Sequence, residues 1–353
     1  MRELKYKFRS RVDGSTERCV SGLVETWIVE SARLCIIASS QPHAAYSDFC
    51  QGLRGKWLHL CRTVPSISSL LQPLEDKIRC KFIPAITRQS APKDALRDLL
   101  ALPARHGGLA IINPVAFADM EFDVSTRLTA PLVALIIAHE RSFGTCQVEQ
   151  RLVRIETQKM KRRREEEAAK NISEMLPENM NRCLILAQEK GALSWLTVKL
   201  LRQHGFALHK SVFHDALALR YDWPLFNLQE KCVCGKNFSP DHAMSCPTGG
   251  LPSMRHNEIR DILGKLISEV STSTRIEPPL QPVTGETFVR QSTTREDDAG
   301  LDIYAYGFWG GRTEDAFFDV RVVNPNAPSY RCLELSSCYC RAEKEKERNM
   351  EKG

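Results

Sequence analysis

The chain has 353 residues, of which 42% are hydrophobic, so it can form two or three domains with apolar cores, and this composition argues against global disorder. Its net charge of +6 is the difference between 49 basic and 43 acidic residues, so a polyanionic partner would have to be bound by local basic clusters. The polar, basic N-terminus and the short, proline-interrupted apolar run at 130–138 predict neither a secretory leader nor a membrane span. The thirteen cysteines are therefore expected to be thiols or metal ligands in a reducing compartment.

Helical periodicity dominates the N-terminal part of the chain. Apolar residues recur at helical spacing through residues 19–60, 69–100 and 116–140. The intervening segment LPARHGGLAIINP, residues 102–114, combines a glycine-bearing turn with a short apolar run. This pattern predicts an N-terminal helical bundle.

Charged residues of both signs fill the stretch RLVRIETQKMKRRREEEAAK, residues 151–170. Such a composition is typical of a solvent-exposed helix that is stabilised by ion pairs between residues four apart. The alternative is a phosphate-contacting or nuclear-import segment that consists of four consecutive basic residues, Lys161, Arg162, Arg163 and Arg164. Under either interpretation we expect this stretch to link two modules, with helices resuming at residues 182–222.

Four potential metal ligands lie close together in the next part of the sequence, at Cys232, Cys234, His242 and Cys246. Three sulfurs and one imidazole nitrogen form a ligand set that suits a tetrahedral structural zinc site. A glycine and a proline within the same segment suit the tight turns that such a loop needs. Only one residue separates the first two cysteines, where two are more common, so buried thiols beside an unrelated histidine are the alternative.

Residues 254–270 have the pattern of an amphipathic helix. Its apolar stripe is expected to consist of Ile259, Ile262, Leu263, Leu266, Ile267 and Val270. Glu258 flanks this stripe near the N-terminal end of the helix. Arg255 and His256 are candidate nucleic-acid contacts, and His256 also fits a catalytic or a purely structural histidine.

Two strand-like runs follow, at residues 300–303 and 317–322, and the loop between them suits a hairpin. Pairing of the two strands can bring Asp302 near Asp319. Two neighbouring carboxylates repel each other unless a hard cation such as Mg²⁺ lies between them, and such an ion can activate water for attack on a phosphate. Alternation places Arg321 on the same face as Asp319. The alternative is therefore a solvent-facing salt bridge between these two residues.

Several longer blocks of the sequence resemble one known family. They are SQPHAAYSDFCQGL (40–53), LLQPLEDKIRCKFIPAIT (70–87), LLALPARHGGLAIINP (99–114), LSWLTVKLLRQHGFALHKSVFHDALALRY (193–221), RHNEIRD (255–261), LDIYAYGFWG (301–310) and FFDVRVVNPNAPSYR (317–331). Together with the cysteine segment, and in this order, they resemble the C-terminal part of the polyprotein of non-LTR retrotransposons, the class that carries a restriction-like endonuclease downstream of reverse transcriptase.

The resemblance implies an α+β protein: an N-terminal helical bundle, a zinc knuckle, and a small restriction-endonuclease-like α/β domain with a mixed sheet. The expected organisation is a polar leader at 1–18, a thumb-like helical region at 19–145, a charged helical linker at 146–181, a helical region at 182–231, a CCHC zinc knuckle at 232–250, and a C-terminally truncated nuclease domain at 251–353.

The resemblance also implies a function. Glu258, Asp302 and Asp319 match the family's catalytic acids, Arg321 occupies the place of a lysine, and Lys346 falls where a family lysine lies on the final helix. The paired-aspartate motif of reverse transcriptase is absent, so no DNA synthesis is expected. We expect a nuclear endonuclease with structural zinc and catalytic Mg²⁺, which would nick target DNA for reverse transcription of the element's RNA. The alternative is a non-catalytic, zinc-containing remnant that binds nucleic acid.

Overall fold

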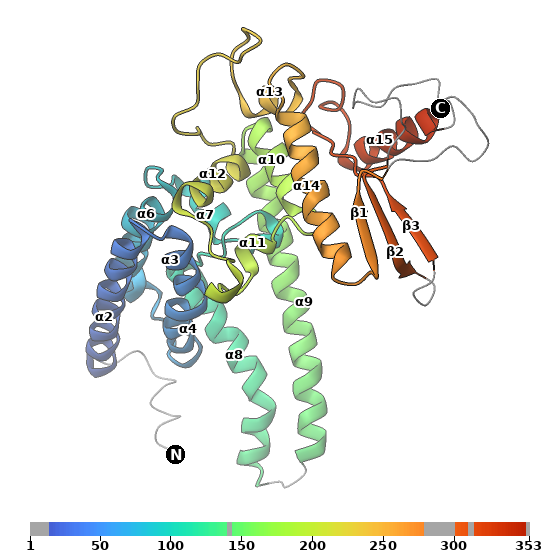
Figure 1. The fold of residues 1–353 in the computed structure, drawn as a ribbon. Coiled ribbons are helices and arrows are strands. Elements are labelled where there is room, and N and C mark those ends of the chain that lie inside the picture. Colours follow the sequence, from blue (N-terminus) through green and yellow to red (C-terminus); the bar gives the residue numbers. More distant parts are fainter. Residues whose placement is uncertain (1–13, 140–142, 279–300, 310–313, 351–353) are drawn as a thin grey trace, which may run out of the picture. The chain divides into compact units, whose positions relative to one another are not determined.

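The structure is a computed structural model that describes residues 14–139, 143–278, 301–309 and 314–350 (Figure 1). The chain forms two compact units, Met1–Phe226 and Asn227–Gly353. Of the polar leader expected at 1–18, the first thirteen residues lie outside the described part, and the remaining five belong to the first helix. The cysteine segment and the predicted nuclease region lie together in the second unit.

Helices are the only regular secondary structure among the described residues of the first unit, as the predicted helical bundle requires. Its α-helices are α2 (Gly14–Ala38), α3 (Pro42–Asp48), α4 (Arg54–Thr63), α5 (Gln72–Lys77), α6 (Ile83–Thr87), α7 (Asp94–Ala101), α8 (Pro114–Ile137), α9 (Phe143–Met175), α10 (Glu178–Gln188), α11 (Ser194–Thr197) and α12 (Lys210–Tyr221). Short 3₁₀ turns lie at Ser68–Leu71, Ala104–His106 and Arg202–His204.

Aromatic side chains form the centre of this unit. Phe49 and Phe82 stack with their ring centroids 4.4 Å apart, and Trp57 lies 5.6 Å from Phe49. Both phenylalanines belong to π-helical turns, Phe49–Leu53 and Ile78–Phe82, which continue directly into α4 and α6. All three rings are buried, and aromatic pairs in this geometry add about 0.5–1.5 kcal/mol each beyond their buried area.

The predicted glycine turn lies between α7 and α8. Gly107 has φ +88°, a conformation that L side chains rarely adopt. A Cβ added at Gly108 would lie 1.9 Å from the Leu102 carbonyl oxygen, so the backbones are too close for any side chain. The Tyr221 hydroxyl on α12 donates to the Gly107 carbonyl at 2.9 Å, and Arg220 donates to the Ala104 carbonyl at 3.1 Å. These contacts explain why two adjacent glycines occur here.

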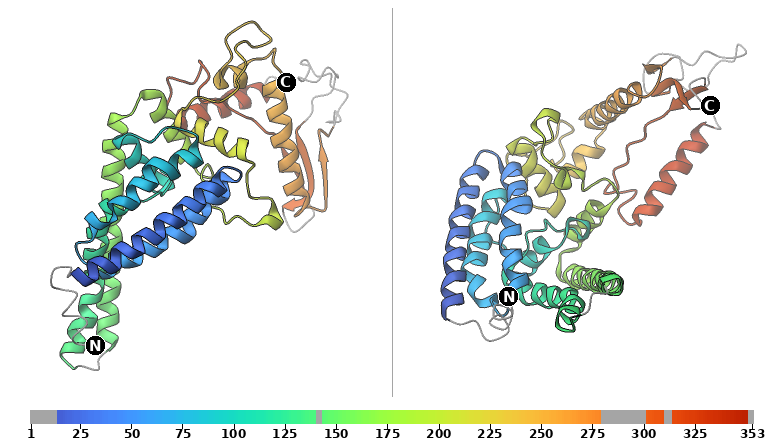
Figure 2. Two further views of the ribbon diagram at one scale, coloured as in Figure 1. Left: turned by 90° about the vertical axis from the view of Figure 1, so that its left-hand side faces the viewer. Right: turned by 90° about the horizontal axis from the view of Figure 1, so that it is seen from below.

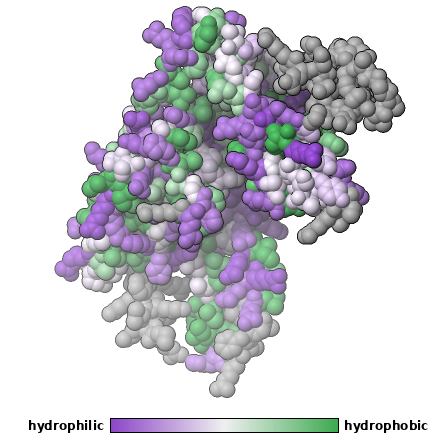
Figure 3. Space-filling model, viewed as in Figure 1, coloured by the Kyte–Doolittle hydropathy of each residue, from purple (hydrophilic) through white to green (hydrophobic). Residues whose placement is uncertain are grey.

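The charged stretch forms most of α9, which runs antiparallel to α8 and packs beside it (Figures 1 and 2). Near the C-terminal end of α9, Ile172 is buried in the core of the first unit. The expectation of a linker at 146–181 is therefore wrong, because this helix belongs to the helical unit. Apolar side chains are nevertheless exposed near the end of the helix pair, among them Ile137 and Leu152, and Figure 3 shows apolar patches (green) among polar ones (purple) at the lower end of that view.

The second unit contains α13 (Pro240–Ser245), α14 (Leu251–Ser268), β1 (Ser273–Ile276), β2 (Ile303–Trp309), β3 (Glu314–Phe318) and α15 (Leu335–Met350). The strands form one sheet in the order β1-β2-β3, and both pairings are antiparallel. Helices in one unit and a small sheet in the other make the protein α+β, as predicted. The mixed sheet is a wrong expectation for the described residues, since no parallel pair occurs among them.

The hairpin of β2 and β3 confirms the predicted pairing but changes its limits. The first predicted strand, at 300–303, overlaps β2 only at Ile303, and the second, at 317–322, overlaps β3 only at its last two residues, so most of both strands lies between the two predicted runs. Strand β3 ends at Phe318 rather than at residue 322. A physical reason is visible, because the Val320 backbone amide donates to the side chain of Asp302 instead of extending the ladder. Phe318 and Val320 pack against the small core of this unit, while Phe317 is exposed, which agrees with the predicted alternation of faces.

Helix α14 packs on the sheet with only part of its apolar stripe. Ile267 is buried against Ile303, with Leu263 beside them. A Cβ at Gly264 would lie 2.4 Å from the Ile276 side chain, so helix and strand approach closely at this glycine. The rest of the expected stripe is exposed to solvent: Ile259, Ile262, Leu266 and Val270. The single-stripe prediction is therefore wrong, since three short strands cover only one side of the helix. None of the described helices, here or in the first unit, is long and apolar enough to cross a membrane.

Candidate metal centre

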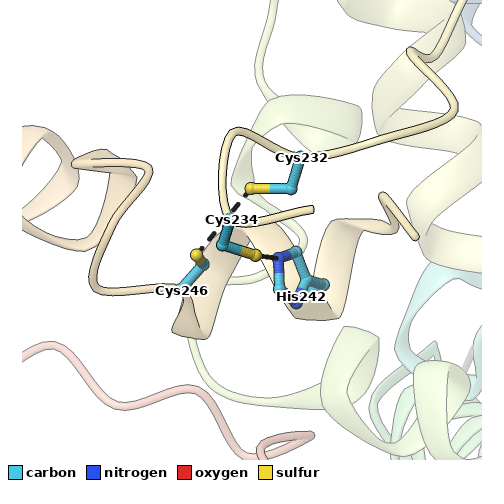
Figure 4. Close-up of side chains that lie close together, drawn as sticks. All are labelled: Cys232, Cys234, His242 and Cys246. Carbon is cyan, nitrogen blue, oxygen red and sulfur yellow. Dashed lines mark hydrogen bonds between the residues drawn. The ribbon is translucent and has the colours of Figure 1, made fainter. Parts of the chain in front are cut away.

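Cys232, Cys234, His242 and Cys246 converge on one point in the second unit (Figure 4). One ligand atom from each residue lies within 4.8 Å of every other. The Cys232 and Cys246 sulfurs are 3.8 Å apart, and the Cys234 sulfur is 3.2 Å from His242 Nε2. Convergence of all four ligands argues against the alternative of buried thiols beside an unrelated histidine.

The backbone around the first two cysteines forms a tight knuckle. Lys231 and Asn237 form an isolated antiparallel bridge, which closes the loop between them. Inside this loop the Cys232 amide donates to the Lys236 carbonyl at 2.9 Å, and the Gly235 amide donates to the Cys232 carbonyl at 2.8 Å. Gly235 has φ +82°, so the glycine noted in the sequence provides the left-handed turn that directs both sulfurs inward.

The other two ligands are positioned by the short helix α13. Ser239 caps this helix, since its hydroxyl accepts the His242 amide at 3.1 Å, and Pro240 occupies the first turn. The capped turn directs His242 toward Cys234, and the helix ends at Ser245, directly before Cys246. Burial alone would raise the pKa of the Cys246 thiol, but hydrogen bonds from the Gly249 and Thr248 amides and from neighbouring thiols bring it below its ordinary value.

This geometry fits a tetrahedral metal ion. With metal–sulfur bonds of about 2.3 Å, two sulfurs of a tetrahedron lie roughly 3.8 Å apart, which matches the spacing of Cys232 and Cys246. Both of these cysteines are buried, and amide donors near Cys246 favour its thiolate form, which is the form that binds metal. The four side chains can therefore hold a metal ion such as zinc.

A second candidate site lies where β2 and β3 meet. Ile303 pairs with Phe318 in the register of the hairpin, so the preceding residue, Asp302, lies opposite Asp319. Burial would raise the pKa of the Asp302 carboxyl, but hydrogen bonds that involve Asp319, the Val320 amide and His256 hold it below its ordinary value. The two aspartates predicted from the sequence thus come together on one side of the hairpin.

His256 is the side chain that α14 presents to this pair. Its Nε2 lies 2.9 Å from Asp302 Oδ1, and both side chains are largely shielded, at 32% and 14% exposed. The sequence allowed a catalytic, structural or nucleic-acid-contacting histidine at this position. Its observed partner is the aspartate.

Glu258, the expected helix-borne acid, does not join this pair. Two residues on a helix are separated by about 200° around the axis, so Glu258 points away from the face that carries His256. Its side chain is exposed, and within the described parts of the chain it has no hydrogen bond or ion pair. The structure thus shows no contact between Glu258 and Asp302, and a part for Glu258 in the acidic site stays a prediction. Arg255, a candidate nucleic-acid contact, is half-buried and donates to the Met244 sulfur at 3.1 Å.

Arg321 is engaged by the final helix. Its guanidinium donates to the Ala342 carbonyl at 2.6 Å and to Glu345 at 3.0 Å. Glu345 also accepts from Arg341 and from the Tyr330 hydroxyl, and these contacts hold the pKa of its carboxyl below its ordinary value. Arg321 thus connects the segment after β3 to α15. Its guanidinium pairs with Glu345 and not with Asp319, which was the alternative to the cation site. The side chain of Lys346 lies outside the described residues.

The basic run in α9 divides into two parts. Lys161 forms an ion pair with Glu121 on α8, and Arg62 of α4 pairs with the same carboxylate at 2.9 Å. The next three side chains, Arg162, Arg163 and Arg164, are exposed. Lys161 therefore has a structural role in joining α4, α8 and α9, whereas the three arginines are available to solvent.

Two contacts of the aspartate site could not be identified from the sequence, namely the Val320 amide and the His256 imidazole on Asp302. The histidine was visible as a candidate, but its partner lies 46 residues further along the chain.

In comparisons with known proteins, the chain matches no family model and no curated protein.

Proposed function

We propose that this protein is a Mg²⁺-dependent DNA endonuclease module of the restriction-like kind, derived from a non-LTR retrotransposon and stabilised by zinc. The observation that carries the proposal is the pairing of Asp302 with Asp319 at the end of the β2–β3 hairpin. The sequence resemblance supports DNA cleavage as the reaction. The Cys/His ligand set supports the same family, in which a CCHC zinc knuckle precedes the nuclease.

Asp302 and Asp319 would hold the cation with one carboxylate each, since Mg²⁺ prefers carboxylate, water and phosphate oxygens. Bound there, the ion would neutralise charge on a scissile phosphate and activate water for hydrolysis. The protein's own contribution is two carboxyl groups brought together at the end of the hairpin, where the Val320 amide and His256 orient Asp302. Arg321 would act indirectly, by holding the segment that carries Asp319 against α15.

Zinc at Cys232, Cys234, His242 and Cys246 would have a structural task. It would fix the loop that leads into α14, the helix that carries His256. A site with four protein ligands leaves no open position for a substrate, which is the arrangement of structural zinc.

A plasmid-nicking assay tests the proposal. Zinc-loaded protein should convert supercoiled DNA to open circles in Mg²⁺ or Mn²⁺, and Asp302→Asn and Asp319→Asn should each reduce the rate at least about 100-fold, because each removes a charged cation ligand. Asp315→Asn is a matched control on the same hairpin, since its carboxylate accepts from Tyr304 outside the pair. Equal rates for all four proteins would remove the aspartates from the reaction.

A second candidate function is nucleic-acid binding without cleavage. It is favoured by the exposed Arg162–Arg164 run and by the arginine, rather than lysine, at position 321. Phosphate contacts release counterions, so binding through this run should weaken steeply as salt increases. A triple substitution of the three arginines by alanine should flatten the salt dependence, while Arg18→Ala, on the exposed start of α2, should not.

A further inference from the structure

His256 lies beside the aspartate pair and contacts Asp302. His256 Nε2 lies 2.9 Å from Asp302 Oδ1, and the imidazole comes from α14 while the carboxylate comes from the residue directly before β2. The contact therefore joins two elements that are separated by the whole of β1 and the segment that follows it in sequence. Because Asp302 is a proposed cation ligand, this contact affects how the carboxylate is oriented toward a cation.

Both oxygens of Asp302 are held by donors from different elements. The Val320 amide, just after β3, donates to Oδ2, and His256 contacts Oδ1. An ionised carboxylate oxygen has about two acceptor positions, so these two donors leave further positions on Asp302, for its contact with Asp319 and for a cation. Two donors on opposite oxygens also fix the plane of the carboxylate, which would otherwise rotate about its Cβ–Cγ bond.

Helix α14 holds His256 firmly in front of the sheet. Arg260, one turn further along the same face, is buried and forms an ion pair with Glu277 just after β1. Gly264, about two turns beyond His256, allows close approach to Ile276, and Ile267, about three turns beyond His256, is buried in the core. The face of α14 that carries His256 is therefore held against the sheet at Arg260, Gly264 and Ile267. A residue that orients a metal ligand must itself be held in place in this way.

We propose that His256 is a positioning residue that donates Nε2–H to Asp302 and thereby prepares its carboxylate to bind a divalent cation. The inference rests on the proposed function for the existence of the cation site, but it assigns a specific role to the histidine. It differs from the expectation that His256 contacts nucleic acid, because the imidazole acts through the aspartate.

The test measures cation affinity, which is independent of cleavage. Mn²⁺ binding to the zinc-loaded full chain is measured by isothermal titration calorimetry for the wild type, His256→Ala, His256→Gln and Asn257→Ala. Outer partners of metal ligands typically contribute 10–100-fold to affinity, so His256→Ala should weaken Mn²⁺ binding at least about 10-fold. His256→Gln retains an N–H donor at a similar reach and should stay within about threefold of the wild type. Asn257→Ala changes an exposed neighbour on α14 and should bind as the wild type does.

The outcomes separate this inference from the proposed function. Equal affinity for the wild type and His256→Ala overturns the positioning role, even if nicking proceeds, and so does an equal loss for His256→Gln and His256→Ala, since the shared N–H donor would then be irrelevant. Mn²⁺ binding with the expected order of affinities but no nicking supports the positioning role and refutes the endonuclease. Absence of Mn²⁺ binding by the wild type overturns the positioning role as well.

Discussion

Removal of the metal should selectively destabilise the second unit. The core cluster of its described residues is small: Ile267, Ile303 and Ala305 are buried, and Leu263, Phe308, Phe318 and Val320 pack against them partly buried. Burial of an isoleucine contributes about 1.5–3 kcal/mol, so the two isoleucines supply roughly 3–6 kcal/mol and the alanine less. Structural zinc contributes on the order of 10 kcal/mol in small domains that fold around it. The metal should therefore dominate the stability of this unit, whereas the first unit has its own large core.

The assay is differential scanning calorimetry of the full chain before and after chelation. A loss of several kcal/mol should lower the transition of the second unit by at least about 15 °C or abolish it, while the transition of the first unit should be unchanged. Cys246→Ser should behave like the chelated protein, because Cys246 is a buried ligand. Cys332→Ala, which alters an exposed cysteine of the same unit, is the control. A second-unit transition that stays within about 3 °C after zinc is shown to be absent would refute the reasoning.

Three further predictions concern the first unit. Gly108→Ala should destabilise it by at least about 2 kcal/mol in urea denaturation, because the new Cβ would lie 1.9 Å from the Leu102 carbonyl oxygen, and a cost below about 0.5 kcal/mol would contradict that close approach. Glu75→Gln should lower the free energy of unfolding by about 3–5 kcal/mol, because it leaves the buried Arg97 guanidinium without its charged partner. Asp94→Asn removes the charge from an exposed pair with Arg79 and should lower it by less than about 1 kcal/mol in the same measurement. Burial, with Arg88 and Lys210 nearby, lowers the pKa of His214 to about 4, so the unfolded state binds the proton first and stability should decline as the pH falls from about 6.5 toward 4. Guanidinium melts of His214→Leu should show a flatter dependence over that pH range, and an unchanged slope would exclude His214 as its source.

The parts of the fold that follow from local pattern were predictable. Helical periodicity identified the bundle, and the spacing of Cys232, Cys234, His242 and Cys246 identified the ligand set. These features depend on side chains that are close in sequence. The hairpin was predictable for the same reason, since β2 and β3 are joined by a short loop.

Features that depend on contacts across the chain were not predictable. Strand β1 has the sequence Ser-Thr-Arg-Ile, which carries no apolar alternation, and it becomes a strand because β2 supplies the pairing edge. The charged α9 looked like a linker because its composition is polar, yet Glu121 on α8 provides a partner for Lys161. The contact between His256 and Asp302 was also not predictable, since the face that α14 presents to the sheet is set by the packing of Gly264 and Ile267.

The central claim is that Asp302 and Asp319 hold one divalent cation, and iron-mediated cleavage of the protein tests it most directly. Fe²⁺ replaces Mg²⁺ in the zinc-loaded chain, and ascorbate with hydrogen peroxide generates hydroxyl radicals that cut the backbone close to the bound ion. Mass spectrometry of the fragments should locate the cuts in residues 300–304 and 317–321, and excess Mg²⁺ or the Asp302→Asn substitution should abolish them. Cuts confined to other parts of the chain, or cuts at these positions that persist in Asp302→Asn, would contradict the account.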